Sequence, residues 1–241
     1  MRSVQNGDVL AQPSRGTMAA KRIMDIVGSA LGLLLLLPVF VLIAVIIKID
    51  SPGPVFFRQE RVGLRGRRFR IFKFRSMVAS APRMGTALTV RGDARITRAG
   101  LSLRRSKLDE LPQLINVIAG EMSIVGPRPE VPELIKFYTP DQRAIILSMR
   151  PGITDYAAIL YRNESSLLDG KCDPVAVYRR EIMPIKFAYY ERYSREVGIL
   201  NDLRIILATI LLLVAGRIPA RLGISLTMRP RVQKRSAQAG M

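Results

Sequence analysis

The longest pattern in the chain is an apolar run near its N-terminal end. Residues 26–47 contain no charged side chain and are bounded by Asp25 and Lys48. At about 1.5 Å per residue, a helix over this run would reach about 33 Å, enough to cross the hydrocarbon core of a bilayer. A signal peptide is a poorer interpretation, because the run is long and no small-residue cleavage site follows it. The pattern predicts a helix that enters lipid.

Pro38 interrupts this run and leaves two topologies open. Proline lacks an N–H donor and kinks a helix. Lys21 and Arg22 precede the run and a dense series of Lys and Arg follows it, so both flanks favour the cytoplasmic side of a membrane. A helix that breaks at Pro38 and leaves by the face it entered satisfies both flanks, whereas a kinked helix that spans the bilayer satisfies one.

A shorter apolar stretch, residues 205–216, lies near the C-terminal end and is too short to span a bilayer. It is typical of a helix that lies in the membrane interface or in the core of a domain. The tail that follows is basic and contains no acidic residue. Such a tail is either a solvated end or an electrostatic attachment to anionic lipid, and the neighbouring apolar helix favours attachment.

The chain between the two apolar stretches predicts a hairpin followed by short helices. Residues 55–62 and 68–75 predict two β-strands, with Gly63 and Gly66 supplying the turn. The period of two places two apolar and two cationic residues on one face of the second strand: Phe69, Ile71, Lys73 and Arg75. Helical spacing predicts helices over 98–108, over 111–120 with Asp109 as N-cap, over 132–150 and over 174–193.

The predicted fold class is α+β, mainly α, with a membrane helix broken at a proline, a short β-hairpin and interfacial amphipathic helices. The pattern contains no regular alternation of strands and helices. The expected organisation is a flexible tail over 1–20, the membrane helix over 21–50, a polar domain over 51–200, an interfacial helix over 201–216 and a basic tail over 217–241.

Composition narrows the chemistry. The chain has 241 residues, of which 38 are Lys or Arg and 19 are Asp or Glu, giving a formal net charge of +19. It has no histidine, which excludes an imidazole base and a His-ligated metal. Its single cysteine, Cys172, excludes an intrachain disulfide and a thiolate zinc or iron–sulfur site. So large a basic excess predicts an anionic partner: nucleic acid, an anionic membrane surface or a phosphate-bearing substrate.

An adjacent acidic pair, Asp109 and Glu110, lies within a basic segment that contains Arg104, Arg105 and Lys107. Neighbouring residues on a helix point about 100° apart, so one carboxylate can meet a reacting atom while the other braces it or accepts a proton. The plain alternative is a pair that only favours the helix N-terminus through the backbone dipole. The same dipole would help to gather a phosphate or a magnesium ion.

The segment 126–130, Gly-Pro-Arg-Pro-Glu, is the second candidate for binding chemistry. Pro127 and Pro129 fix the backbone on both sides of Arg128, so the planar guanidinium loses little entropy on binding a ligand. Paired prolines also occur in turns that are merely rigid. A pre-aimed arginine is nevertheless well suited to a phosphate, and the segment 150–154, Arg-Pro-Gly-Ile-Thr, repeats the pattern more weakly.

Taken in order, these motifs resemble the bacterial sugar transferase family, the monotopic phosphoglycosyl transferases. The resemblance covers roughly residues 21–163, and its most specific parts are LDELPQL at 108–114 and GPRP at 126–129. The full order of motifs is KRxxD, the apolar run with its internal proline, SPGPVFFRQERVG, FKFRSM, LDELPQLxNV, GEMSxVGPRPE and RPGIT.

The resemblance implies transfer of sugar 1-phosphate from a UDP-sugar to polyprenyl phosphate, with release of UMP, as the first membrane step of glycoconjugate or exopolysaccharide assembly. It implies Asp109 as the nucleophile that forms a phosphosugar-aspartyl intermediate, and Glu110 as the carboxylate that orients it or accepts a proton. Magnesium is the implied cofactor, with Asp109 as its protein ligand. The implied substrate-binding residues are Lys73, Arg75, Arg104, Pro127 and Arg128.

The resemblance also favours one topology. It implies a re-entrant membrane helix broken at Pro38, with the 51–200 domain catalytic and on the cytoplasmic face of the bacterial inner membrane. Inner-membrane lipid is then a further partner, and a homodimer stays open. Two departures from the family pattern, Asp155-Tyr156 after RPGIT and Lys186-Phe187 before two tyrosines, fall where the sugar pocket is expected, so the resemblance does not name the sugar.

Two rival functions are weighed against this one. A membrane-tethered basic protein could bind anionic lipid or nucleic acid without catalysis. Aromatic residues make up only 6% of the chain and Trp is absent, so few stacking platforms exist and nucleic acid is not expected as a partner. The other rival is an enzyme of the same class that uses direct displacement in a ternary complex, with the carboxylates only holding magnesium.

Overall fold

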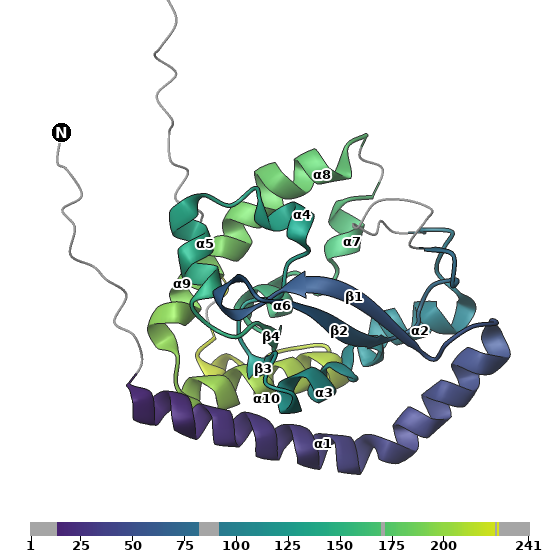
Figure 1. Cartoon of the computed structure of the whole chain (residues 1–241), viewed down its shortest axis with the longest axis horizontal. Coiled ribbons are helices and arrows are strands. Elements are labelled where there is room, and N and C mark those ends of the chain that lie inside the picture. Colours follow the sequence, from purple (N-terminus) through teal and green to yellow (C-terminus); the bar gives the residue numbers. More distant parts are fainter. Residues whose placement is uncertain (1–13, 82–91, 170–171, 225, 227–241) are drawn as a thin grey trace, which may run out of the picture.

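The computed structural model describes residues 14–81, 92–169, 172–224 and 226. Within these residues the chain is mainly helical, with two small sheets, and the body of the molecule lies along one side of a single long helix (Figure 1). The prediction of a mainly α fold with little sheet is therefore confirmed. The predicted tails fall largely outside the described residues.

The long helix is α1 (Arg15–Asp50), and it begins earlier than the predicted residue 21. Ser14 caps it, because the Ser14 hydroxyl accepts the Thr17 N–H at 3.1 Å. The backbone stays helical through Pro38, and Figure 1 shows α1 bending upward in its second half, as a proline kink predicts. Among the described helices, α1 is the one long and apolar enough to cross a membrane by length and composition.

The predicted hairpin is present. Strand β1 (Phe56–Val62) pairs antiparallel with β2 (Arg68–Phe74) across a 3₁₀ turn at Leu64–Gly66. Two apolar side chains of β2, Phe69 and Ile71, are buried on one face of the hairpin and pack with Val117 and Met122. Phe74 is also buried, and its ring lies 5.0 Å from that of Phe40 in α1, so the hairpin is held between the body and the long helix.

A second sheet was not predicted. Strand β3 (Ser123–Val125) pairs in parallel with β4 (Gly152–Thr154), and three residues are too few to display a period of two. The pairing places Gly126 against Gly152 so closely that a Cβ on Gly152 would lie 2.1 Å from the Gly126 nitrogen. The two proline-containing motifs, 126–130 and 150–154, are therefore neighbours in space.

Short helices surround these sheets, and their bounds confirm the helical regions predicted over 98–108, 132–150 and 174–193. A π-helical turn, Tyr178–Ile182, leads into α9, and six fully buried tyrosines fill the core between these helices: Tyr138, Tyr156, Tyr178, Tyr189, Tyr190 and Tyr193. The helices are α2 (Arg98–Ser106), α3 (Gln113–Ile118), α4 (Pro132–Ile135), α5 (Pro140–Leu147), α6 (Tyr156–Leu160), α7 (Glu164–Leu167), α8 (Pro174–Val177), α9 (Met183–Glu196) and α10 (Ile199–Ala215).

The N-terminal half of α1 is fastened to the body by polar contacts. The Lys21 ammonium donates to Asp202 of α10 at 2.5 Å and to the Val125 carbonyl at 3.0 Å. Asp25 accepts the Ile124 N–H at 3.0 Å. These groups belong to the KRxxD motif, so the motif serves to join α1 to β3 and α10.

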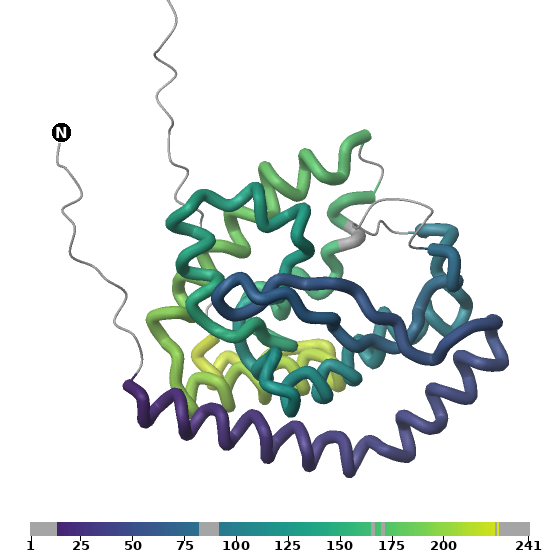
Figure 2. Tube along the Cα trace, in the orientation of Figure 1, coloured from purple at the N-terminus to yellow at the C-terminus, as the bar shows by residue number. Residues whose placement is uncertain are grey.

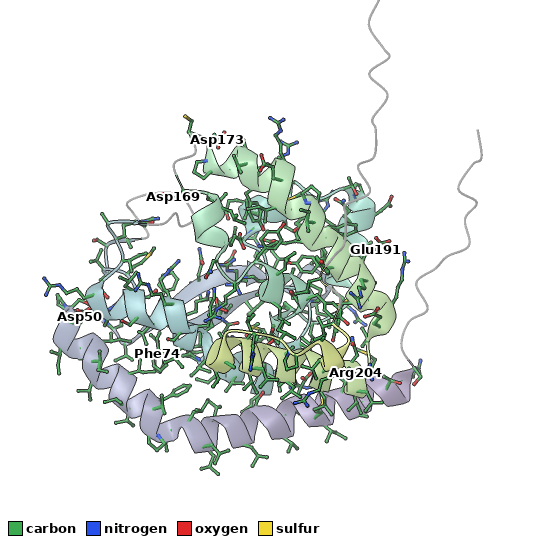
Figure 3. The ribbon with its side chains drawn as sticks, turned by 180° about the vertical axis from the view of Figure 1, so that it is seen from behind. Asp50, Phe74, Asp169, Asp173, Glu191 and Arg204 are labelled. Carbon is green, nitrogen blue, oxygen red and sulfur yellow. The ribbon has the colours of Figure 1, made fainter. Side chains whose placement is uncertain are left out.

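The C-terminal half of α1 is fastened to the same body by apolar contacts. Ile43 and Ile47 are buried in a cluster with Phe74 and Leu103. Figure 2 shows that both halves of α1 run beside the body, and in Figure 3 the labelled Asp50 and Arg204 lie near its opposite ends. The middle of the helix is exposed, with 76% of Leu35 accessible.

Candidate functional site

The two adjacent carboxylates lie in a tight turn between α2 and α3. Lys107 adopts a left-handed conformation, with φ of 60°, and ends α2. The 3₁₀ turn Leu108–Glu110 follows, and Asp109 and Glu110 are only 6% and 9% exposed. Acidic residues at the start of a helix are usually exposed, whereas this short turn buries both carboxylates.

The predicted N-cap role of Asp109 is wrong. Helix α3 begins at Gln113, and Pro112 occupies the N-cap position without a side-chain hydrogen bond. The left-handed turn at Lys107 directs the chain into a 3₁₀ turn that continues in helical conformation through Leu111. The Asp109 side chain is consequently not used to cap a helix.

Glu110 is clamped by two cations. Lys73 of β2 donates to Glu110 Oε1 at 2.8 Å, and Arg128 donates to Oε2 at 3.0 Å and also to Oε1. Burial would raise the pKa of Glu110, but Arg128 and Lys73 outweigh it and hold that pKa well below its usual range. Glu110 is therefore a fixed anion that positions Arg128 and Lys73, which favours the orienting role over that of a proton acceptor.

Asp109 is in the opposite situation. Its Oδ1 is buried and has no hydrogen-bond partner among the described residues. Burial, and then the charge of Glu110, raise the pKa of Asp109 above its ordinary value, while Lys73, Arg104 and Lys107 act in the other direction. A buried carboxylate oxygen without a hydrogen-bond partner is unusual, and such a group beside a cleft is a candidate for catalysis. The turn thus gives two neighbouring carboxylates two different environments.

Four cationic side chains line one cleft together with the pair, and we call them the positive wall: Lys73, Arg104, Lys107 and Arg128. Burial lowers the pKa of Lys73 to about 8 and also lowers the pKa of Lys107. Arg104 lies on α2, five residues before Asp109, and donates to Ser76 Oγ at 3.4 Å. The structure therefore brings together Asp109, Glu110 and three of the cations predicted from the sequence: Lys73, Arg104 and Arg128.

Arg128 is aimed by its loop. The loop leaves β3, and the Pro127 carbonyl accepts the Gly152 N–H at 2.9 Å. Asp155 accepts the Arg128 N–H at 3.1 Å and the Ala158 N–H at 2.5 Å, so it joins this loop to the start of α6. Pro127, predicted to bind substrate, is not among the residues that line the cleft, and its carbonyl instead fastens the loop to β4. Asp155 is the residue at which the chain departs from the family pattern, and this positioning contact could not be seen in the sequence.

The structure shows a structural contact of Arg75 with the end of α1. Its guanidinium donates to the carbonyl oxygens of Pro52 at 2.8 Å, Ser51 at 2.6 Å and Ile47 at 3.2 Å. These acceptors lie at the C-terminal end of α1, where a cation also complements the helix dipole. Arg75 is 4% exposed and caps the C-terminal end of α1, and it also lines the cleft that contains Asp109. Its predicted contact with substrate stays a prediction.

A cleft of about 1510 Å³ contains the carboxylates and the positive wall. One side of it carries a second polar network, in which Glu130 accepts the hydroxyl groups of Tyr138 at 3.1 Å and Tyr178 at 2.9 Å. Lys186, which belongs to the second departure from the family pattern, is buried on the same side of the cleft as Glu130 and Tyr178. It pairs with Glu164 at 2.6 Å. The sequence pattern predicted Lys186 near the sugar pocket, and it does line the cleft that holds Asp109.

Arg61 is a site residue that the sequence pattern did not reveal. It is half-buried and donates to the Pro129 carbonyl at 3.2 Å. Burial, and then the charge of Arg128, lower its pKa to about 10. In the sequence Arg61 is one of many basic residues that follow the apolar run, and only its position behind the 126–130 loop indicates a function.

A magnesium ion bound at the carboxylate turn would have to share its ligands with a substrate. No group of three His, Cys, Asp or Glu residues in the described part of the chain could hold a metal. Magnesium is commonly bound by one or two carboxylates together with substrate phosphates and waters. Both Glu110 oxygens are engaged by cations, so the unpartnered Asp109 oxygen is the protein ligand that this arrangement offers.

Comparison with known proteins supports the same chemistry. The model of the bacterial sugar transferase family matches residues 16–216, which include α1, the carboxylate turn and α10. The chain belongs to the bacterial sugar transferase family. It is thereby an enzyme of the phosphoglycosyl transferase class.

Several sugar transferases are similar to the chain over most of its length. The UDP-glucose:undecaprenyl-phosphate glucose-1-phosphate transferase of Caulobacter vibrioides is 38% identical over 192 residues, covering 79% of this chain and 68% of the relative. The exopolysaccharide production protein PSS of Rhizobium leguminosarum is 39% identical over 204 residues, covering 80% of this chain and 94% of the relative.

Other relatives are longer. The UDP-N-acetylgalactosamine-undecaprenyl-phosphate N-acetylgalactosaminephosphotransferase of Aeromonas hydrophila is 40% identical over 162 residues, which cover 65% of this chain and 37% of the relative. The undecaprenyl-phosphate glucose phosphotransferase of Komagataeibacter xylinus is 40% identical over 209 residues, which cover 82% of this chain and 36% of the relative. The chain therefore spans about a third of the length of these two transferases.

Proposed function

We propose that the protein transfers sugar 1-phosphate from a UDP-sugar to polyprenyl phosphate and releases UMP. The observation that carries this proposal is the contrast within the buried pair: Glu110 is held by Arg128 and Lys73, while Asp109 keeps an oxygen without a partner. Phosphoryl transfer requires charge neutralisation, alignment and a nucleophile, and the cations and the Asp109 carboxylate of the cleft are suited to these requirements. The named activities of several relatives, on UDP-glucose or UDP-N-acetylgalactosamine with undecaprenyl phosphate, support the same class of substrates.

The reaction proceeds in two displacements at one phosphorus atom. The Asp109 carboxylate attacks the phosphorus that carries the sugar, the bond from this phosphorus to UMP breaks, and UMP leaves with the electron pair. The product is a sugar phosphate linked to the aspartyl carboxylate. An oxygen of the lipid phosphate then attacks the same phosphorus, the bond to Asp109 breaks, and the carboxylate is restored. Neither step requires a proton from a histidine.

The cations and the cofactor neutralise the charge that moves during these steps. Arg128 and Lys73 lie beside Asp109 and can contact the two phosphates of the donor. Arg104 and Lys107 extend the positive wall toward α2. Magnesium, when bound at Asp109, would neutralise the donor diphosphate and favour the departure of UMP.

The same proposal includes the re-entrant topology of α1, at the cytoplasmic face of the bacterial inner membrane. The N-terminal half of α1 is tied to the body at Lys21, and the C-terminal half at Ile47. A straight transmembrane span would carry one of these ends to the far side of the bilayer, away from the body. Attachment of both ends to one body, a bend between them and basic flanks on both sides all support entry and exit on one face.

The first membrane step of exopolysaccharide or other glycoconjugate assembly is the process that this transfer would serve. One relative is named as an exopolysaccharide production protein. The rival function, anionic-lipid binding without catalysis, requires a basic surface but no enclosed acidic pair. The Glu110 clamp therefore favours the enzyme.

A replacement of Asp109 tests the mechanism. We expect Asp109→Asn to lower UMP release from a UDP-sugar and undecaprenyl phosphate by about a thousandfold or more, because the amide is a poor nucleophile. Asp141→Asn is the matched control, since Asp141 is an exposed residue of α5 outside the cleft, and it should retain activity. Full activity in Asp109→Asn would refute the mechanism.

A labelling experiment separates the covalent mechanism from direct displacement. A radiolabelled UDP-sugar incubated without lipid acceptor should leave label on the wild-type protein, and hydroxylamine should release it because the linkage is an acyl phosphate. The Asp109→Asn variant should carry no label. If UMP release required both substrates and no labelled protein formed at any time, the reaction would proceed by direct displacement in a ternary complex.

A further inference from the structure

The cleft extends beyond the carboxylates toward α1. Its lining continues from Asp109 through Leu111 and Leu114 and along β4 to α10, and most side chains in this part are apolar. The two hydroxyl groups in it, those of Thr154 and Thr209, bond to each other at 2.7 Å. Figure 1 shows α3 and α10 on the side of the body that faces α1. The apolar residues of this α3–α10 groove are Leu111, Leu114, Ile153, Ile206, Ile210 and Leu213.

One wall of the groove is a regular face of α10. Ile206, Ile210 and Leu213 are spaced four and three residues apart, so they share one side of the helix. Another side of α10 is buried through Ile205 and Ala208. The packing of that side leaves Ile210 51% exposed, next to the exposed Leu203, Leu207 and Val214 on the same helix. An apolar patch of this kind marks a surface that contacts lipid, a ligand or another protein.

The opposite wall is formed by the start of α3 and is backed by the membrane helix. A Cβ on Gly32 of α1 would lie 3.3 Å from Leu114 Cδ1, so α1 passes directly behind this residue. No residue of α1 lines the cleft, so α1 supports this wall of the groove from behind. A molecule could lie in the groove with one end among the cations and the other end in lipid.

The two substrates of the proposed reaction differ in their match to this groove. A UDP-sugar is polar at both ends and has no group that gains from apolar walls. A polyprenyl phosphate has a phosphate at one end and a hydrocarbon chain at the other, in the same order as the cations and the apolar walls of the cleft. Burial of each isoprene unit against these side chains would be favourable, because apolar surface leaves water.

We propose, resting on the proposed transferase function, that the α3–α10 groove binds the first isoprene units of the polyprenyl phosphate acceptor, with the phosphate directed toward Lys73 and Arg128. The groove then sets the acceptor phosphate at Asp109 from the membrane side. The nucleotide is left with the remaining part of the cleft, toward α2 and the hairpin. The site thereby receives a lipid and a water-soluble substrate from different directions.

A substitution on the exposed rim of the groove tests this assignment. Ile210→Asn should raise the KM for undecaprenyl phosphate by about tenfold, because a polar group replaces an apolar contact of the chain. The KM for the UDP-sugar should change less than about twofold. Leu207→Asn is the matched control: Leu207 is 45% exposed on the same helix, does not line the cleft, and should change neither constant.

Other outcomes of this measurement would overturn the assignment. An equal rise in Leu207→Asn would mean that α10 only docks the protein on the bilayer. A rise confined to the UDP-sugar would assign the groove to the donor. No change in either constant would mean that the chain lies elsewhere.

A second measurement does not depend on turnover. Photolabelling of the full chain with a polyprenyl phosphate that carries a diazirine in its first isoprene units should mark peptides within 111–114 or 206–213. Labels confined to the exposed face of α1 would overturn the groove. If the wild-type protein failed to release UMP but these peptides were labelled, the proposed function would fail while the lipid site would stand.

Discussion

At the scale of single residues, environment gives two adjacent acids different chemistry. Glu110 is bound by two cations, which hold its pKa below the usual range. Asp109 is buried, has an oxygen without a hydrogen-bond partner, and has a raised pKa. A pair of acids whose environments move their pKa values apart is a common arrangement at catalytic sites. The difference arises from Lys73 and Arg128, which are distant from the pair in the sequence.

Lys73 predicts a pH dependence of the reaction. Burial lowers its pKa to about 8 from an ordinary 10.5, so the ammonium is charged below pH 8 and loses its proton as the pH rises through this value. We therefore expect kcat/KM for the UDP-sugar, measured with saturating acceptor, to fall above about pH 8. This parameter reports groups of the free enzyme.

The variant Lys73→Arg separates Lys73 from other groups. Arginine stays charged beyond pH 12, so the fall near pH 8 should disappear or move to much higher pH. Arginine also alters the geometry of the site and lowers kcat/KM at every pH, but the pH at which kcat/KM falls can still be compared between the two proteins. A fall that persists at the same pH would point to another group, such as Lys107, whose pKa burial also lowers.

At the scale of elements, the site depends on contacts between segments that are distant in sequence. The parallel pairing of β3 with β4 brings the 126–130 loop beside the 150–154 segment, and Gly126 and Gly152 permit the close approach. Asp155 then holds the Arg128 N–H. The long helix is joined to the same region, because Lys21 contacts both Val125 and Asp202.

The buried ion pair between Lys21 and Asp202 predicts a large loss of stability when it is broken. Lys21→Met leaves the Asp202 carboxylate buried without its cation, which typically costs about 3–5 kcal/mol. We expect the apparent Tm in detergent to fall by about 10 °C, since about 1 kcal/mol shifts the Tm of a domain of this size by about 2–4 °C. The double variant with Asp202→Asn should recover part of the loss.

An exposed ion pair provides the control for this experiment. Arg68 and Glu60 pair at 2.8 Å on the hairpin, with about half or more of each side chain accessible. Exposed pairs contribute about 1 kcal/mol or less, so Arg68→Met should move the Tm by at most a few degrees. Equal shifts in Lys21→Met and Arg68→Met would mean that the Lys21–Asp202 pair contributes no more to stability than an exposed ion pair.

At the scale of the whole molecule, the exposed apolar surface and the charged cleft lie on different parts of the protein. The exposed apolar residues of α1 lie along one side of the molecule, and the positive wall and carboxylates lie in a cleft on the body. The formal charge of +19 is shared between the flanks of α1, the C-terminal tail and this wall. Such a division matches an enzyme that takes one anionic substrate from water and the other from lipid.

The re-entrant topology predicts where cysteine probes react. In a Cys172→Ser background, Ala19→Cys and Pro54→Cys, at the two ends of α1, should both react with an impermeant maleimide from the cytoplasmic side alone. Leu35→Cys, in the exposed middle of the helix, should react only after detergent is added, because the bilayer covers it. Labelling of Ala19→Cys and Pro54→Cys from opposite sides would establish a transmembrane span.

Much of the fold followed from short-range patterns. The apolar run, the hairpin and the helices over 132–150 and 174–193 were predictable because each has a local period. The strands β3 and β4 were not, because three residues carry no period and their pairing joins segments distant in sequence. The start of α1 was placed too late, because the polar first turn is stabilised by a Ser14 cap that hydropathy does not reveal.

The sequence by itself determined the class of chemistry: carboxylates, arginines and lysines without histidine, beside an apolar helix, in an order of motifs over residues 21–163 that resembles one family. Only the tertiary structure decided how these residues divide their functions. Arg75 and Lys73 are neighbours on one strand face, yet Arg75 caps α1 while Lys73 holds Glu110. The physical reason is that charge and hydrogen bonding depend on which groups meet after folding, and those partners come from distant parts of the chain.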